Sequence, residues 1–123
     1  MRVNGEQILQ SYLDTIYGIS NKEYQERVWV RGEGPECDDF TETVCHFFDD
    51  GDPVINHYRD YEITYEQYQL LKKFRDDFRV FSDQYNEAFE FINTSEWAEI
   101  MEKAKAVLKA FNYIKKPEST RPQ

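Results

Sequence analysis

The chain has 123 residues, of which 40% are hydrophobic, and its 24 acidic residues against 15 Lys and Arg give a net charge of −9. The length is that of one domain, and nine Phe, nine Tyr and two Trp supply enough apolar surface for a packed core, which excludes a disordered chain. The acidic balance disfavours direct binding to nucleic acid or to an anionic membrane, because both require a basic surface.

The first helix is predicted from apolar residues at helical spacing that follow a capping box of Asn4 and Gln7, and Gly18 is expected to end it. A second capping box, Ser20 with Glu23, predicts a short helix through about residue 31. Residues 27–31 also alternate as in a strand, so helix and strand both remain open there. Residues 32–35 contain two Gly and one Pro and predict a break.

An acidic helix is predicted from about Glu36 to Asp49, with an apolar stripe made of Cys37, Phe40, Val44, Phe47 and Phe48. Residues 36–39 would lie in its first turn, where the helix dipole favours negative charge. A turn is expected at 50–53, where the sequence is Asp-Gly-Asp-Pro, and a shorter segment should follow through residues 58–61.

Over about 64–92 the sequence predicts one long amphipathic helix or two collinear helices, with a bend near residues 82 and 83. It begins at a capping box of Thr64 and Gln67. Its apolar positions recur every three or four residues at Tyr68, Leu71, Phe74, Phe78, Phe81, Tyr85, Ala88 and Ile92. A last helix is capped by residues 93–95 and ends near Tyr113, with Trp97, Ile100, Met101, Ala104, Leu108 and Phe111 facing inward.

Together these elements predict an all-α fold: a single-domain helical bundle of about four to six helices over residues 1–116. A polar, disordered tail is expected over residues 117–123. No run of about 18 apolar residues is present, so no segment is expected to span a bilayer. Residues 1–13 lack the order of a signal peptide, and two cysteines without an export signal are typical of reduced thiols. The sequence therefore predicts a cytoplasmic protein.

The charge is concentrated between Gly32 and Tyr58, where the chain has eight acidic residues and no Lys or Arg. The remainder holds 24 − 8 = 16 acids against 15 bases and is nearly neutral. Because clustered like charge creates a local field, this segment is the feature that points to a partner. The candidate carboxylates are Glu36, Asp38, Asp39, Glu42, Asp49, Asp50 and Asp52, and Tyr58 and Tyr61 are candidate anchors. The alternative is a solvated face that keeps the protein soluble.

A metal site is not expected, although Cys37, Cys45, His46 and His57 are residue types that bind zinc. On one helix the two cysteines would lie roughly 12 Å apart, too far for a tetrahedral zinc or a disulfide. Residues 49–52 lack the ligand spacing of an EF-hand calcium loop. No cofactor is predicted either.

A catalytic site is the weaker alternative. His46 and Asp50 are one helical turn apart, and His57 could complete a hydrolytic or metal-dependent centre. The chain contains no Gly-rich phosphate loop, nucleophile elbow, HExxH motif or kinase signature.

The leading expectation is a non-enzymatic protein that occludes a basic protein partner through residues 33–61. Its sharpest form is an immunity protein that neutralises a toxin, such as a nuclease whose cleft must be positive to hold phosphates. Small, acidic, helical immunity proteins have a similar size and charge. The likeness is one of physical properties alone, because no motif of this chain matches one of theirs. A further alternative is a helical subunit of a homo-oligomer, with part of the aromatic surface exposed.

Overall fold

The computed structural model describes residues 5–34 and 38–113, and these residues form helices and no strand. The α-helices are α1 (Gly5–Ser20), α2 (Lys22–Tyr24), α3 (Phe40–Asn56), α4 (Tyr65–Ser82) and α5 (Ser95–Ala110). They are joined by a π-helix, η1 (Gln25–Val30), and by two 3₁₀ segments, η2 (Tyr58–Tyr61) and η3 (Ala88–Glu90). The predicted all-α bundle is confirmed. The predicted tail at 117–123 lies outside the described residues.

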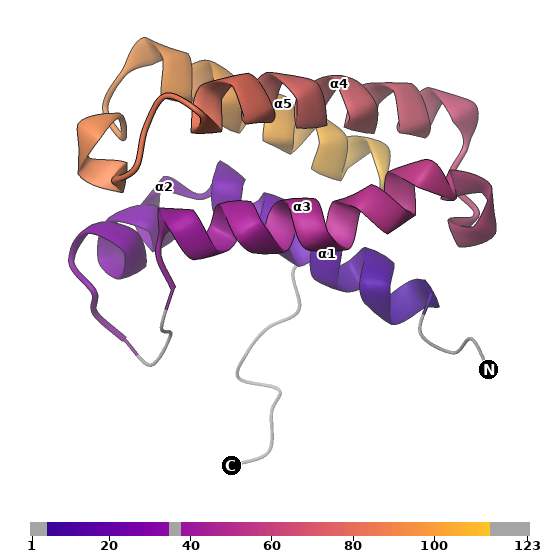
Figure 1. Cartoon of the computed structure of the whole chain (residues 1–123), viewed down its shortest axis with the longest axis horizontal. Helices are drawn as coiled ribbons and strands as arrows, with labels where there is room; N and C mark the ends of the chain where they lie inside the picture. The colour runs from indigo at the N-terminus through magenta and orange to yellow at the C-terminus, as the bar shows by residue number, and fades with distance from the viewer. Residues whose placement is uncertain (1–4, 35–37, 114–123) are drawn as a thin grey trace.

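The helices are arranged in two layers (Figure 1). Helices α1 and α3 form one layer, and α4 and α5 form the other. Helix α1 packs against both α3 and α5, and α4 packs against both α5 and α3. The core therefore lies between the two layers. None of the described helices has the length and the hydropathy to cross a membrane.

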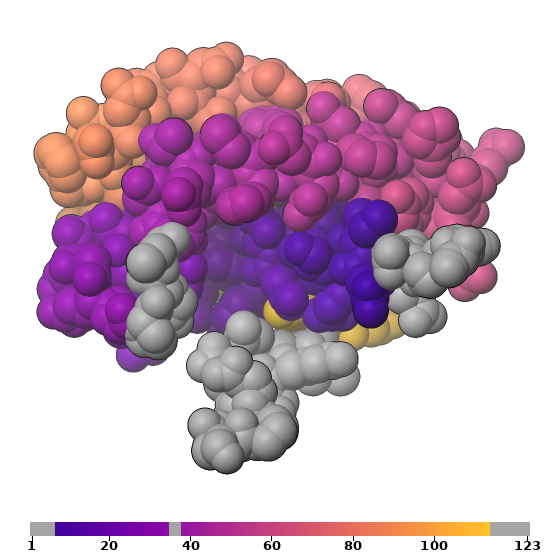
Figure 2. All heavy atoms as spheres, turned by 60° about the horizontal axis from the view of Figure 1, so that its bottom comes forward, coloured from indigo at the N-terminus to yellow at the C-terminus, as the bar shows by residue number. Residues whose placement is uncertain are grey.

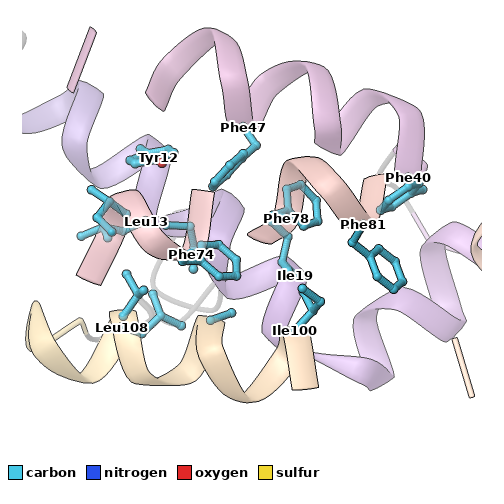
Figure 3. Close-up of a cluster of buried hydrophobic side chains, with 14 of the residues drawn as sticks. Tyr12, Leu13, Ile19, Phe40, Phe47, Phe74, Phe78, Phe81, Ile100 and Leu108 are labelled. Carbon is cyan, nitrogen blue, oxygen red and sulfur yellow. The ribbon is translucent and has the colours of Figure 1, made fainter. Parts of the chain in front are cut away.

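The core between the layers is rich in aromatic rings, which pack among aliphatic side chains such as Leu13 and Ile100 (Figure 3). Phe40 of α3 lies 4.7 Å from the ring of Phe91 and 6.1 Å from that of Phe78. Further along α3, the ring of Phe47 lies 5.6 Å from that of Phe74 and 5.0 Å from that of Phe78. Aromatic rings bury large areas, so the high aromatic content is used mainly inside. Among the described residues the exposed large hydrophobic side chains are Val30, Tyr65, Leu70, Val80 and Phe89.

The junction between α1 and η1 depends on one buried amide. Gln25 is fully buried; its Nε2 donates to the carbonyls of Gly18 and Ile19 at 2.9 and 2.8 Å, and its Oε1 accepts from Nε1 of Trp97 at 2.9 Å. The prediction that Gly18 ends the first helix is wrong, since α1 continues to Ser20. The Gln25 amide satisfies carbonyls at the end of α1, so no left-handed glycine is needed there.

The second element is helical, and the strand alternative is excluded for residues 27–30, which lie in η1. Its cap differs from the prediction. Asn21, rather than Ser20, accepts the N–H of Tyr24 at 3.2 Å, whereas the Ser20 hydroxyl donates to the carbonyl of Tyr17. The Asn4 part of the first predicted capping box lies outside the described residues.

Helix α3 begins later and ends later than predicted. It starts at Phe40, with Asp39 as its N-cap, so residues 38 and 39 precede the first turn rather than forming it. Residues 36 and 37 lie outside the described part of the chain. At the other end, the predicted turn at 50–53 is wrong, because these residues are helical and α3 continues to Asn56.

The physical reason for the longer helix is packing. A Cβ on Gly51 would lie 2.6 Å from the Cε1 and Cζ atoms of Tyr12, so this glycine permits a close approach between α1 and α3 rather than a turn. Pro53 lacks the N–H for a bond one turn back. The helix continues past it because Val54 and Ile55 are buried, and the N–H of His57 donates to the carbonyl of Pro53 at 3.0 Å.

Helix α4 is shorter than the predicted span of 64–92, because it ends at Ser82. The predicted capping box is confirmed, with Thr64 and Gln67 exchanging bonds of 2.9 and 3.1 Å. After Ser82 the chain turns back through η3, which places Phe91 and Ile92 in the core. Helix α5 is capped by Thr94, within the predicted cap, and ends at Ala110 rather than near residue 113.

Two helical glycines, Gly18 and Gly51, provide a matched test of this packing. We expect Gly51→Ala to lower the free energy of unfolding by about 1–3 kcal/mol, because the new methyl group overpacks the Tyr12 ring. Gly18→Ala should instead raise it by about 0.5–1 kcal/mol, because the nearest atom to its Cβ is a Tyr24 ring carbon at an ordinary 3.5 Å. Urea denaturation followed by circular dichroism measures both. Equal effects of the two substitutions would contradict this account of α3.

Candidate acidic binding surface

Four of the predicted carboxylates lie along α3 and form a surface that we call the acidic ridge: Asp39, Glu42, Asp49 and Asp50. The first three are exposed and Asp50 is half-buried. Asp39 accepts the N–H of Glu42 at 2.8 Å, and Asp50 accepts the Ser11 hydroxyl at 3.4 Å. Among the described residues, no Lys or Arg forms an ion pair with a member of the ridge. The ridge is therefore a row of carboxylates whose charge no Lys or Arg of the described residues neutralises in an ion pair.

Asp38 has a different environment from the ridge. Its carboxylate accepts from the Tyr24 hydroxyl at 2.6 Å, from Nε1 of Trp29 at 3.1 Å and from the Thr43 hydroxyl at 3.1 Å. These bonds fasten the residue before α3 to α2 and η1. The sequence placed Asp38 with the partner-binding residues, but its oxygens are already bonded to three donors within the protein.

Three other predicted residues make contacts with α4 or the core. Asp52 pairs with Arg75 of α4 at 3.0 Å, which balances its charge. The ring of Tyr58 stacks on that of Tyr68 with centroids 4.2 Å apart, and Tyr61 is half-buried against the core. Glu36 lies outside the described residues. The predicted set is thus divided between an exposed ridge and residues that stabilise the fold.

A groove lies beside the ridge, between α1, α2 and the start of α3, with a volume of about 580 Å³. Figure 2 shows α1 (indigo) recessed below α3 (magenta) on this face. The charged side chains in its lining are three carboxylates, one Arg and one His: Asp14, Glu23, Asp38, Arg27 and His46. Sequence analysis missed Asp14 and Glu23, because only the packing of α1 against α3 brings them near the acidic segment.

The position of Asp14 is fixed by a tyrosine from the end of the described chain. The hydroxyl of Tyr113 donates to Oδ1 of Asp14 at 2.6 Å, and its ring lies 5.7 Å from that of Tyr17. Burial, together with the hydrogen bond to the Asp14 carboxylate, raises the pKa of Tyr113 above its ordinary value. The hydroxyl therefore stays protonated near neutral pH and continues to donate to Asp14.

Of the alternative catalytic residues, His46 and Asp50 lie one turn apart on α3, whereas His57 lies beyond the end of this helix. His46 lines the groove, whereas His57 is the C-cap of α3, and both are exposed. Eleven residues along a helix separate them by roughly 16 Å. The described residues contain no group of three or more His, Cys, Asp and Glu side chains that could hold a metal ion. Cys45 is exposed on α3, and its predicted relation to Cys37 lies outside the described residues.

The chain matches no protein-family model, no curated protein and no solved structure. Any functional proposal therefore rests on surface features of this structure, such as the ridge and the groove.

Substitutions of Asp38 and Asp49 compare the stability contributed by a carboxylate bonded within the fold with that contributed by an exposed one. Asp38→Ala should lower the free energy of unfolding by about 1–3 kcal/mol, because it leaves the indole N–H of Trp29 and two hydroxyls without their acceptor. Asp49→Ala, an exposed member of the ridge, should change it by less than about 0.5 kcal/mol. Chemical denaturation of both variants measures the difference. If Asp38→Ala proved as mild as Asp49→Ala, Asp38 would belong functionally with the ridge.

Proposed function

We propose that this protein is a non-enzymatic binding protein that occludes a basic surface of a protein partner through the acidic ridge. The observation that carries the proposal is the row of carboxylates along α3, three of them exposed, none of which forms an ion pair with a Lys or Arg of the described residues. Clustered like charge opposes folding through self-repulsion, whereas a positive partner would gain from it. Complementary charge also steers association and rejects wrongly charged partners.

The rigidity of α3 supports the same function. The helix is held from within by Phe40, Phe47, Val54 and Ile55, which are buried between the two layers. A ridge built on a packed helix keeps its carboxylates in fixed relative positions, so little conformational entropy is lost when a partner binds.

The sharpest form of the proposal is an immunity protein that neutralises a toxin. A nuclease is a fitting target, because the cleft that binds phosphates must be positive and an array of carboxylates can compete for it. A cytoplasmic location, which the sequence predicts, would place the inhibitor where such a toxin finds cellular nucleic acid.

The test compares two variants that remove the same number of charges. The ridge variant carries Asp39→Asn, Glu42→Gln, Asp49→Asn and Asp50→Asn. Asn still caps α3, and Asp38 is left intact because it stabilises the fold. The control variant removes four exposed carboxylates from the other layer and its connecting loop: Asp83→Asn, Glu96→Gln, Glu99→Gln and Glu102→Gln.

We expect a basic protein to be retained from a host lysate by the wild type and the control variant. This basic protein should not be retained by the ridge variant, or by the wild type at high salt. The affinity of the ridge variant for the purified partner should be lower than that of the wild type by more than about tenfold. Circular dichroism verifies that both variants are folded. Identical proteins retained by all three forms would mean that the ridge is only a solvated face.

A further inference from the structure

A stack of tyrosine rings lies where the chain passes from α3 through η2 into α4, at one end of the bundle (Figure 1). The rings of Tyr58 and Tyr68 are almost parallel, with centroids 4.2 Å apart and an interplanar angle of 17°. Tyr65 is the first residue of α4, and its ring centroid lies 5.9 Å from that of Tyr68. We call these three side chains the tyrosine stack.

The two ends of the tyrosine stack have different surroundings. At one end the guanidinium of Arg59 lies over the ring of Tyr58, 5.8 Å from its centroid, which is the distance of a cation–π contact. At the other end Tyr65 is 57% exposed, whereas Tyr58 and Tyr68 are half-buried. Among the described residues, no guanidinium or ammonium lies over the ring of Tyr65. The chain therefore places its own guanidinium at one end of the stack and leaves the other end accessible to solvent.

The charges near the tyrosine stack favour a cation as its ligand. Residues 58–68 contain three acids and one Arg. The acids are Asp60, Glu62 and Glu66, and all three are exposed. Lys72 of α4 is paired with Asp76 and adds no net charge. Even with Lys109, at the neighbouring end of α5, the acids outnumber the bases by three to two.

Of the cations that a protein partner offers, a guanidinium fits this surface best. It is planar, so it stacks on an aromatic ring, and it is less strongly hydrated than an ammonium. The contact between Arg59 and Tyr58 is an example of this interaction within the chain itself. Tyrosine and arginine are also enriched at the positions that dominate the binding energy of interfaces. A nucleobase could stack on the same ring, but the acids would repel the phosphates attached to it.

We propose that the exposed ring of Tyr65 receives an arginine side chain of the protein partner, at the end of the tyrosine stack opposite Arg59. Glu62 and Glu66 precede and follow Tyr65 by three positions and one position, and their carboxylates favour the bound charge. The inference rests on the proposed function and makes it more specific, because the ridge attracts a basic partner and Tyr65 anchors one of its side chains.

The probe is an acetylated, amidated hexa-arginine peptide, titrated into the full-length protein with ¹³C-labelled tyrosine rings and ¹⁵N-labelled amides and followed by NMR. The ring signals of Tyr65 should shift, and arginine side-chain protons of the peptide should move upfield because they lie over the ring. Tyr65→Leu keeps an apolar side chain without the ring. It should weaken binding at residues 58–68 by about two- to fivefold, the contribution of a cation–π contact at an exposed site.

Two controls separate the ring from general effects of substitution. Tyr65→Phe keeps an aromatic ring and should bind the peptide nearly as well as the wild type. Phe89→Leu removes another exposed ring, that of η3, and should leave binding unchanged. A hexa-lysine peptide should shift the Tyr65 signals less than hexa-arginine does at the same concentration, because the ammonium is more strongly hydrated.

The outcomes also separate this inference from the proposed function. Equal peptide binding by Tyr65→Leu and the wild type would overturn the anchor, while the lysate experiment decides the ridge independently. Equal shifts with hexa-lysine would overturn the choice of a guanidinium. If Tyr65→Leu left peptide binding unchanged but abolished self-association in sedimentation velocity, the occupant would be a second copy of this chain rather than a partner.

Discussion

The close contact between Tyr12 of α1 and Gly51 of α3 sets the spacing of the layer that carries the candidate site. Atoms of the Tyr12 ring lie only 2.6 Å from where a Cβ of any other residue would be, and the ring of Phe47 lies 5.1 Å from that of Tyr12. Burial raises the pKa of the Tyr12 hydroxyl, so it remains neutral within the core. Because α3 is held against α1 at this point, the ridge lies next to the groove between α1, α2 and the start of α3.

The acidic segment shows how a folded domain accommodates concentrated charge. Asp52 is balanced by Arg75 of the opposite layer, Asp38 accepts three hydrogen bonds, and Asp39 caps the helix that follows. Each of these arrangements lowers the cost of a carboxylate near the core. The carboxylates of Glu42 and Asp49 point to solvent and receive no such compensation from the described residues. This contrast is the physical basis for the proposal that the ridge binds a partner.

The amino-acid sequence by itself determined the helical class, the caps at Thr64 and Thr94, the inward-facing stripes and the segment in which the charge lies. These features depend on residues within four positions of one another, which is the range of a helical turn and of a capping bond. Local patterns therefore predicted buried residues even beyond the end of α4, at Ala88 and Ile92.

Only the tertiary structure decided where helices end and which carboxylates are free. Helix α1 continues past Gly18 because the side-chain amide of Gln25 donates to the Gly18 carbonyl near the end of the helix. Gln25 is held in place by Trp97, which is 72 positions away in the chain. Gly51 is helical because Tyr12 packs on it from another helix. Asp52 is neutralised by Arg75, 23 positions away, and Asp14 joins the acidic surface only because α1 lies beside α3. Such contacts join residues that are distant in the chain, and no local pattern carries information about them.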